Sequence, residues 1–387
     1  MHDYPLLTTI AAGFAFAWAL GLLARWMRLS PIVGYLAAGV AIGPYTPGFV
    51  GDPKIAHQLA EIGVILMMFG VGLHFHLKDL LRVRGVAIPG AVVQSVVATA
   101  VTFVLFRWFG WPWQAGLVLG MALAVASTVV LLRVLMDRDL LTTQHGHVAV
   151  GWLIVEDIFT VLALVAVPLL GGAAAGGAAG QGGLAALGWA VAKLAALVGL
   201  VALAGFRVVP WVLTQVARTR SRELFTLTVL VFSITIAVGS AALFDASVAL
   251  GAFLAGMVVA QSPVSHQAGA DALPLRDAFA VLFFVSVGML FDPGFVVREP
   301  WMVVAALGVV LVAKPLAALA IVAVLGYPIR TALTVAIGLG QIGEFSFILA
   351  AVAIDHDVLP EEGRHVLVAT AMASITLNTV AFRTLEP

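Results

Sequence analysis

The apolar positions of the chain fall into long continuous runs that are separated by short polar or proline-containing breaks. A helix of about 20 apolar residues crosses a bilayer, and most of these runs are that long. Proline marks several breaks, for example Pro31 before the second run, Pro44 after it, and Pro328. The pattern predicts 13 membrane-spanning helices, over residues 5–27, 31–43, 54–75, 85–106, 113–135, 144–170, 184–212, 221–243, 245–261, 272–291, 300–325, 329–354 and 363–384.

Composition supports this prediction and excludes several classes of protein. Hydrophobic residues make up 62% of the chain, charged residues make up 10%, and the mean hydropathy is +1.10. A water-soluble fold of 387 residues could not bury so much apolar surface, so an all-α polytopic membrane protein is expected. The formal net charge is zero, which argues against nucleic acid as a partner, and the chain has no cysteine for disulfides, thiolate nucleophiles or metal ligation.

Lysine and arginine are distributed unevenly among the predicted loops. With the N-terminus outside, 14 of the 20 basic residues lie in inside loops or at inside span ends. The outside loops hold Lys54, Arg107, Arg298 and Arg364. Because basic residues concentrate on the cytoplasmic side, we expect the N-terminus to lie outside and the C-terminus in the cytoplasm.

Two pairs of segments indicate an internal repeat. Residues 59–75 resemble residues 275–291, 216 positions later, and residues 34–39 resemble residues 251–256 at an offset of 217. The segment 171–183 is almost entirely Gly and Ala, which favours a flexible linker. We therefore expect one repeat over residues 1–183, a linker helix over 184–220 and a second repeat over 221–387. Six spans per half with one between them would place the halves in opposite orientations, as in secondary transporters with inverted repeats.

Ionisable residues within spans are costly, so each is a candidate for function. The mid-span set is Glu156, Asp157, Lys193, Lys314 and Glu344. Successive helical residues point about 100° apart, so we expect one carboxylate of Glu156-Asp157 to face an ion path and the other to face a partner. Lys314 precedes Pro315, and a buried ammonium needs a carboxylate; Glu156 is the natural candidate. Lys193 is expected to reach an interface.

Two of the predicted spans have interiors that favour an interruption of the helix. Span 5 contains Ser127 and Thr128, and span 12 contains Gly340, Gln341, Gly343 and Glu344. Interrupted helices that cross would expose carbonyls to a cation, with Ser127 and Thr128 supplying further oxygens, and Glu344 could neutralise the positive end of a half-helix. The alternative for Ser127 and Thr128 is ordinary bonding of their hydroxyls to the preceding turn.

The motifs resemble the Kef-type branch of the monovalent cation:proton antiporters (the CPA2 superfamily), and within it the YbaL-type members. The resemblance is carried by residues 34–39, 60–64, 126–128, 156–158, 273–289 and 343–345. It implies an NhaA/NapA-like fold of 13 spans with crossing interrupted helices, a dimerisation domain that forms a homodimer, and a mobile core moving as an elevator in the plasma (bacterial inner) membrane. It also implies that Asp157 binds cation and proton in turn, with Lys314 at the position of a lysine that pairs with the preceding acid.

Two departures from the family limit what the resemblance implies. Residues 266–269 keep the histidine of a glutathione-gating motif but lack its glutamate. Full-length relatives continue into a cytosolic nucleotide-binding domain, whereas this sequence stops at Pro387 without a GxGxxG motif. Either the sequence is part of a longer protein or the protein lacks that domain, and a separate cytosolic regulatory domain or subunit is a possible partner.

These features predict a transporter that exchanges a monovalent cation, K⁺ or Na⁺, for H⁺, with no cofactor in this chain and the cation as its substrate. A cation channel could use the same carboxylates but would move cations without protons. A cation-coupled solute symporter would need a pocket for an organic substrate. An intramembrane enzyme is not expected, because the sequence has no His-Glu-x-x-His motif and no cysteine nucleophile.

Overall fold

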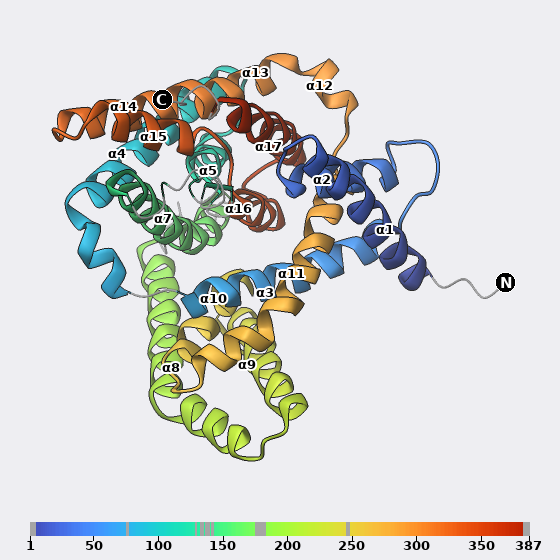
Figure 1. Ribbon diagram of the computed structural model, residues 1–387, viewed down its shortest axis with the longest axis vertical. Helices are drawn as coiled ribbons and strands as arrows, with labels where there is room; N and C mark the ends of the chain where they lie inside the picture. The colour runs from blue at the N-terminus through green and yellow to red at the C-terminus, as the bar shows by residue number, and fades with distance from the viewer. Residues whose placement is uncertain are drawn as a thin grey trace. The chain divides into compact units, whose positions relative to one another are not determined.

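A computed structural model describes residues 5–74, 77–127, 130–131, 135, 140, 143–174, 183–244 and 248–381 (Figure 1). All regular structure in these ranges is helical. The helices are α1 (Pro5–Trp26), α2 (Pro31–Ile42), α3 (Pro53–His74), α4 (Leu77–Trp108), α5 (Trp113–Ala124), α7 (Gln144–Ala174), α8 (Gly183–Arg218), α9 (Arg222–Phe244), α10 (Val248–Ala260), α11 (Ser265–Met289), α12 (Gly294–Arg298), α13 (Pro300–Gly308), η1 (Val309–Ala313), α14 (Lys314–Val324), α15 (Ile329–Leu339), α16 (Glu344–Asp355) and α17 (Glu361–Ala381).

By length and composition, seven helices in the described residues could each cross a membrane: Pro5–Trp26, Lys54–Leu73, Gly85–Trp108, Gly146–Pro168, Arg222–Phe244, Ser265–Met289 and Pro300–Val324. The pair α15 and α16, bent by 43° at a short break, adds an eighth if it forms one span. Three shorter apolar helices are α2, α5 and α10. The prediction of an all-α polytopic protein is therefore confirmed, and the number of 13 spans stays a prediction.

Each predicted span coincides with one to three helical segments, but several predicted bounds are wrong. The span expected over 113–135 loses its helical backbone after Ala124, where Val125 is extended. The expected linker over 171–183 is helical at both ends, because α7 continues to Ala174 and α8 begins at Gly183. The rest of that linker, residues 175–182, lies outside the described residues.

The predicted span over 300–325 is a helix with one irregular turn. Pro315 has no amide hydrogen and cannot bond to the carbonyl four residues earlier, so the regular ladder is interrupted there. The backbone responds with a single π-helical segment, η1, at whose end the amide of Lys314 bonds to the carbonyl of Val309, five residues back. Such single π-turns are frequent at functional sites.

The chain divides into two compact units, each of which draws on both halves of the sequence. The first comprises the described parts of Met1–Phe14, Asp52–His76 and Leu164–Ser286, and the second those of Ala15–Gly51, Leu77–Ala163 and Val287–Pro387. In the first unit α10 packs against α3, α8 and α9. In the second unit α4 packs against α5 and α14, and α14 packs against α15. The expected halves, 1–183 and 221–387, are a division by repeat and stay a prediction.

A buried tryptophan lies at the centre of the second unit. Trp152 of α7 is fully buried and packs with apolar residues of α4, α14 and α15. Gly90 of α4 faces it, and a Cβ atom there would lie 2.2 Å from the Trp152 ring. The tryptophan fixes α7 against α4, and α7 carries the two carboxylates that the sequence singled out.

Candidate functional site

Two helices of the second unit are interrupted, and their interruptions lie against each other (Figure 1). α5 ends at Ala124 and continues into the extended residues 125–127. α15 ends at Leu339, and residues 340–343 lead to α16. The amide of Gly343 donates to the carbonyl of Val125 at 3.1 Å. Both helix ends lie within spans 5 and 12, where the sequence predicts interruptions, and we call the place where the two segments meet the crossing.

The close approach of the two backbones requires a glycine at position 343. A Cβ atom on Gly343 would lie 2.6 Å from the carbonyl oxygen of Ala126 and 2.8 Å from its carbon. Real Cβ atoms essentially never come so close to a backbone. The φ angle of Gly343 is −88°, so contact distance, not backbone conformation, excludes a side chain here.

Side chains at the second interruption donate hydrogen bonds to carbonyl groups at the first. Gln341 donates through Nε2 to the carbonyl of Ser127 at 3.1 Å, and Ser346 donates through Oγ to the carbonyl of Ala122 at 2.5 Å. Both donors come from the segment 340–346 and both acceptors from the end of α5 or just beyond. In a membrane an unsatisfied backbone group costs several kcal/mol, so these bonds allow the helices to stop in mid-membrane.

Residues from three further helices support the same crossing. Gln94 of α4 donates to the carbonyl of Ala124 at 3.2 Å, and Trp152 donates through Nε1 to the Oε1 atom of Gln94 at 3.0 Å. Asn378 of α17 donates to the carbonyl of Ile337. None of these three residues is predicted from the sequence above. Each is a polar or amphipathic side chain in an apolar span, and that is the signal that could identify them.

Ser127 has a structural task at the crossing. Its hydroxyl accepts a hydrogen bond from the amide of Val130 at 3.2 Å, and its carbonyl accepts from Leu131 at 3.1 Å. The side chain is 1% exposed. Its hydroxyl bonds forward to the next turn, not back to the preceding turn. Thr128, the second predicted oxygen donor, lies outside the described residues.

Glu156 and Lys314 connect the two interruptions from either side. Both side chains are 0% exposed, and they interact electrostatically. Glu156 accepts through Oε2 from the amide of Ala126 at 2.7 Å, within the first interruption. Lys314 donates through Nζ to the carbonyl of Gln341 at 3.2 Å, within the second. The carboxylate of Glu156 therefore binds one interrupted segment, and the ammonium of Lys314 binds the other.

Asp157 differs from its neighbour Glu156 in exposure. It is the next residue on α7, about 100° further around the helix, and it is partly exposed where Glu156 is fully buried. Glu344 is partly buried and begins α16, so its carboxylate lies at the positive end of that half-helix. The remaining mid-span group, Lys193 of α8, is partly buried and belongs to the other unit.

Comparisons with known proteins identify the family of this chain. The model of the family described as "Sodium/hydrogen exchanger, transmembrane" matches residues 12–385. The "Putative cation/proton antiporter YbaL" of Escherichia coli K12 is 52% identical over 386 residues, which cover 100% of this chain and 69% of YbaL. The "Glutathione-regulated potassium-efflux system protein KefC" of Salmonella typhi is 32% identical, covering 93% of this chain and 58% of KefC. The resemblance to Kef-type antiporters is confirmed, and these relatives are transporters rather than enzymes.

A solved structure supports the fold. The sodium proton antiporter MjNhaP1 from Methanocaldococcus jannaschii superimposes with a TM-score of 0.64, covering 97% of this chain and 95% of MjNhaP1. The two sequences are 13% identical, so this likeness concerns the fold alone.

Proposed function

The chain belongs to the sodium/hydrogen exchanger family, and from this premise we propose that it exchanges a monovalent cation, K⁺ or Na⁺, for H⁺ by alternating access. Asp157 binds the cation and the proton in competition. The observation that carries the proposal is the difference in burial and bonding between two adjacent carboxylates. Glu156 is buried, bonded to Ala126 and paired electrostatically with Lys314, whereas Asp157 keeps partial exposure.

The exchange follows from competition at one carboxylate. An ionised Asp157 attracts a hard monovalent cation, and a protonated Asp157 does not. Neutral oxygens of Ser127, Thr128 and the crossing residues 340–343 complete the cation's ligands, with Gln341 and Glu344 at the second interruption. Movement of the second unit would carry Asp157 between the two sides of the membrane, and each passage would carry either the cation or the proton.

Recurring glycine contacts support the proposal that the chain is an inverted repeat. In the second unit a Cβ atom on Gly288 would lie 2.2 Å from the carbonyl oxygen of Leu36 and 3.0 Å from the Cα of Gly39. In the first unit a Cβ atom on Gly256 would lie 2.2 Å from the carbonyl oxygen of Phe69 and 2.8 Å from the Cα of Gly72. Gly39 and Gly256 are 217 positions apart, and Gly72 and Gly288 are 216 apart. Each unit thus uses the same pair of repeat positions.

A second pair of contacts recurs in the same register. A Cβ atom on Gly34 would lie 2.4 Å from the carbonyl oxygen of Leu20, and one on Gly251 would lie 2.8 Å from the Cα of Ala237. Both members of the first contact are 217 positions before their counterparts in the second. With α15 and α16 as one span, and with α2, α5, α8, α10 and α17 each counted as a span beside the seven long helices, the number of spans is 13.

The assembly and orientation complete the proposal. The asymmetry of lysine and arginine supports an outside N-terminus and a cytoplasmic C-terminus in a bacterial inner membrane. We place the dimer contact of a homodimer in the first unit and the mobile core in the second, because the crossing and both carboxylates belong to the second unit.

The test is cation-induced proton movement in proteoliposomes that contain an internal pH dye, with the voltage clamped at zero. Wild type should move protons when K⁺ or Na⁺ is added, and the more effective ion identifies the substrate. Asp157→Asn keeps the side chain's shape but cannot exchange a proton, so proton movement should fall to the level of protein-free liposomes. Asp277→Asn is the matched control, because Asp277 is 67% exposed and paired with Arg276 on α11.

Three outcomes would contradict the proposal. Cation flux without proton movement would indicate a channel, and proton-coupled uptake of an organic solute would indicate a symporter. Full exchange by Asp157→Asn would remove Asp157 from the mechanism while leaving the family assignment intact.

A further inference from the structure

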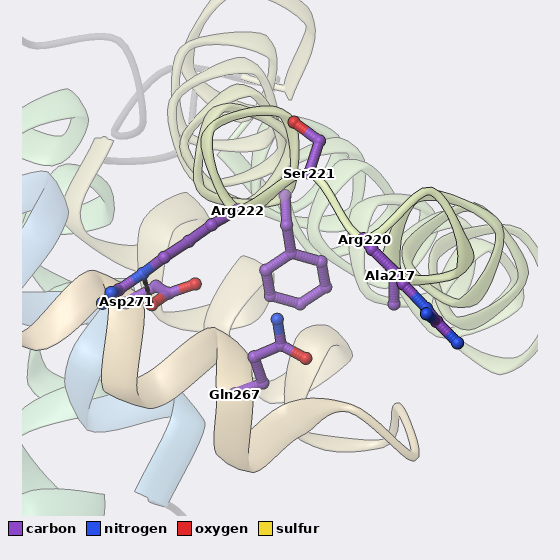
Figure 2. Close-up of a pocket in the computed structure, with 7 residues that line it drawn as sticks. Ala217, Arg220, Ser221, Arg222, Gln267 and Asp271 are labelled. Carbon is purple, nitrogen blue, oxygen red and sulfur yellow. Dashed lines mark hydrogen bonds and ion pairs between the residues drawn. The ribbon is translucent and has the colours of Figure 1, made fainter.

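A cavity of about 300 Å³ lies in the first unit, where α8 ends, α9 begins and the first turns of α11 pass beneath (Figure 2). It is lined by Ala217, Arg220, Ser221, Arg222, Phe225, Gln267 and Asp271. Its volume is at the small end of the range for small-molecule sites. Arg222 is also the first residue of an apolar candidate span, so the cavity lies at the level where a membrane meets water.

One side of the cavity holds the carboxylate of Asp271, of which only one oxygen has a hydrogen-bond partner. Arg222 approaches Asp271 Oδ1 through both Nε and Nη2, each at 3.1 Å. The other oxygen, Oδ2, is buried and has no hydrogen-bond partner, and the Asp271 side chain is 7% exposed. Burying a carboxylate oxygen without a donor is costly. A ligand with several N–H donors would remove that cost.

The opposite side of the cavity holds a cation. Arg220 adopts a left-handed backbone conformation with φ of 58° in the turn between α8 and α9. Figure 2 shows Arg220 and Arg222 extending in opposite directions, with Gln267 below them. Within the described residues no carboxylate pairs with Arg220. The cavity thus presents an anion-binding group, Arg220, and a cation-binding group, Asp271.

We propose that this cavity binds the zwitterionic headgroup of an ethanolamine phospholipid. The phosphate accepts hydrogen bonds from Arg220, and the primary ammonium donates to Asp271 Oδ2. A choline headgroup has the same charges but no N–H donor, and a glycerol headgroup has no positive charge. The site therefore discriminates among headgroups through Asp271.

The surface of α9 provides room for the acyl chains. Leu224, Leu227, Val231, Ile234 and Val238 are 41–56% exposed and recur at helical spacing on one face. This apolar face begins one helical turn from the cavity, so a headgroup in the cavity would place its lipid tails along the face. Continuity between the charged cavity and the apolar face favours a lipid over a soluble molecule.

The experiment is native mass spectrometry of the purified full chain, offered equal amounts of ethanolamine, choline and glycerol phospholipids with identical acyl chains. The ethanolamine lipid should be retained about tenfold more than the choline lipid, as the charge-assisted bonds to Asp271 predict. Asp271→Asn should lower its retention to the choline level. Arg220→Gln should lower the retention of both lipids, and Arg218→Gln, an exposed arginine two residues away that does not line the cavity, should change neither.

Thermal unfolding with and without added lipid provides a second readout for any variant that expresses poorly. Equal retention of the glycerol lipid, or an unchanged preference in Asp271→Asn, would overturn the proposal. Displacement of the lipid by soluble phosphoethanolamine at equal concentration would overturn the lipid source. Efficient disulfide formation between copies of Leu227→Cys, in a chain that has no other cysteine, would instead assign the apolar face of α9 to a contact between two copies.

Discussion

Two helix crossings, one in each unit, bring backbones together through glycine in different ways. In the first unit α3 and α10 are continuous where they cross, and a Cβ atom on Gly72 would lie 2.2 Å from the carbonyl oxygen of Phe253. In the second unit both crossing helices are interrupted, and a Cβ atom on Gly343 would lie 2.6 Å from the carbonyl oxygen of Ala126. Both contacts exclude a side chain, but their consequences for the backbone differ.

The difference explains why the two carboxylates lie beside the second crossing. Continuous helices satisfy their own amides and carbonyls, so the α3–α10 crossing needs only small residues. The interrupted crossing frees carbonyls such as that of Ala122, and polar side chains such as that of Ser346 must enter the apolar interior to bind them. An irregular backbone thus brings polar groups into the apolar interior, as the cation site proposed above requires.

Breaking the buried pair of Glu156 and Lys314 should cause the largest loss of stability among the changes that distinguish the two crossings. Lys314→Met leaves Glu156 buried in the interior without its cation, which typically costs about 3–5 kcal/mol. We expect a large fall in the thermal unfolding temperature of the detergent-solubilised protein. Gly308→Ala, on α13 with no atom within 4 Å of the added Cβ, is the control and should have no such effect.

The double variant Glu156→Gln/Lys314→Met distinguishes a charge pair from two independent contacts. Removing both charges together should restore much of the stability that Lys314→Met loses, because neither charge is then left unpaired. Additive losses in a double-mutant cycle would mean that the two residues stabilise the crossing separately.

Substitution of the crossing glycines should separate stability from transport. Gly72→Ala and Gly343→Ala each force a methyl group against a backbone, and we expect each to cost about 1–3 kcal/mol of stability. Gly343→Ala should also lower cation-induced proton flux by at least about tenfold, because it displaces the groups beside Asp157. Gly239→Ala, with open space around its added Cβ, is the control for the first unit.

The measurement that compares Gly72→Ala with Gly343→Ala is the cation-induced proton flux per folded protein. If Gly72→Ala lowers that flux as strongly as Gly343→Ala does, then the continuous crossing also takes part in transport and the contrast between the crossings is wrong.

A smaller effect should follow from removing one carbonyl partner. Ser346→Ala leaves the carbonyl of Ala122 at the end of α5 without its side-chain donor, at a cost of about 1–2 kcal/mol. Ser346→Thr keeps the hydroxyl and should restore most of that loss. Thermal unfolding measures both variants, and equal stability of Ser346→Ala and wild type would show that Ala122 does not need this bond.

The residue types within each span predicted where the helices of this site are interrupted. They did not predict the hydrogen bonds between distant parts of the sequence. Glycines at 340 and 343 and the run Ser127-Thr128 predicted the interruptions, because these residues weaken a helix by themselves. The bonds from Gln94, Ser346 and Asn378 could not be predicted in the same way, because each joins residues 30 or more positions apart. Ser127 was expected to bind a cation. Its hydrogen bond from the amide of Val130 could not be predicted as well, because that bond depends on where the helix restarts.

The smallest effect concerns an ion pair at the water-exposed end of the second unit, and it contrasts with the buried pair. Asp292 precedes α12 and bonds to Arg298 and to the amide of Gly294. The hydrogen bond from Arg298 holds the pKa of Asp292 below its ordinary value of 3.8. A lowered pKa means that the ionised form stabilises the folded state, and this contribution is lost only as the pH falls from about 3.8 through the lowered pKa.

Arg298→Gln should therefore lower stability slightly at neutral pH, by less than about 1 kcal/mol, since the arginine is 63% exposed. The variant should also lose less stability than wild type when the pH is taken from 5 to about 3, because its Asp292 titrates nearer the ordinary value. Unfolding temperatures across this range measure the difference, with Arg25→Gln, an exposed arginine in the last turn of α1, as the control. A loss for Arg298→Gln as large as that for Lys314→Met would mean that burial does not set the strength of these two pairs.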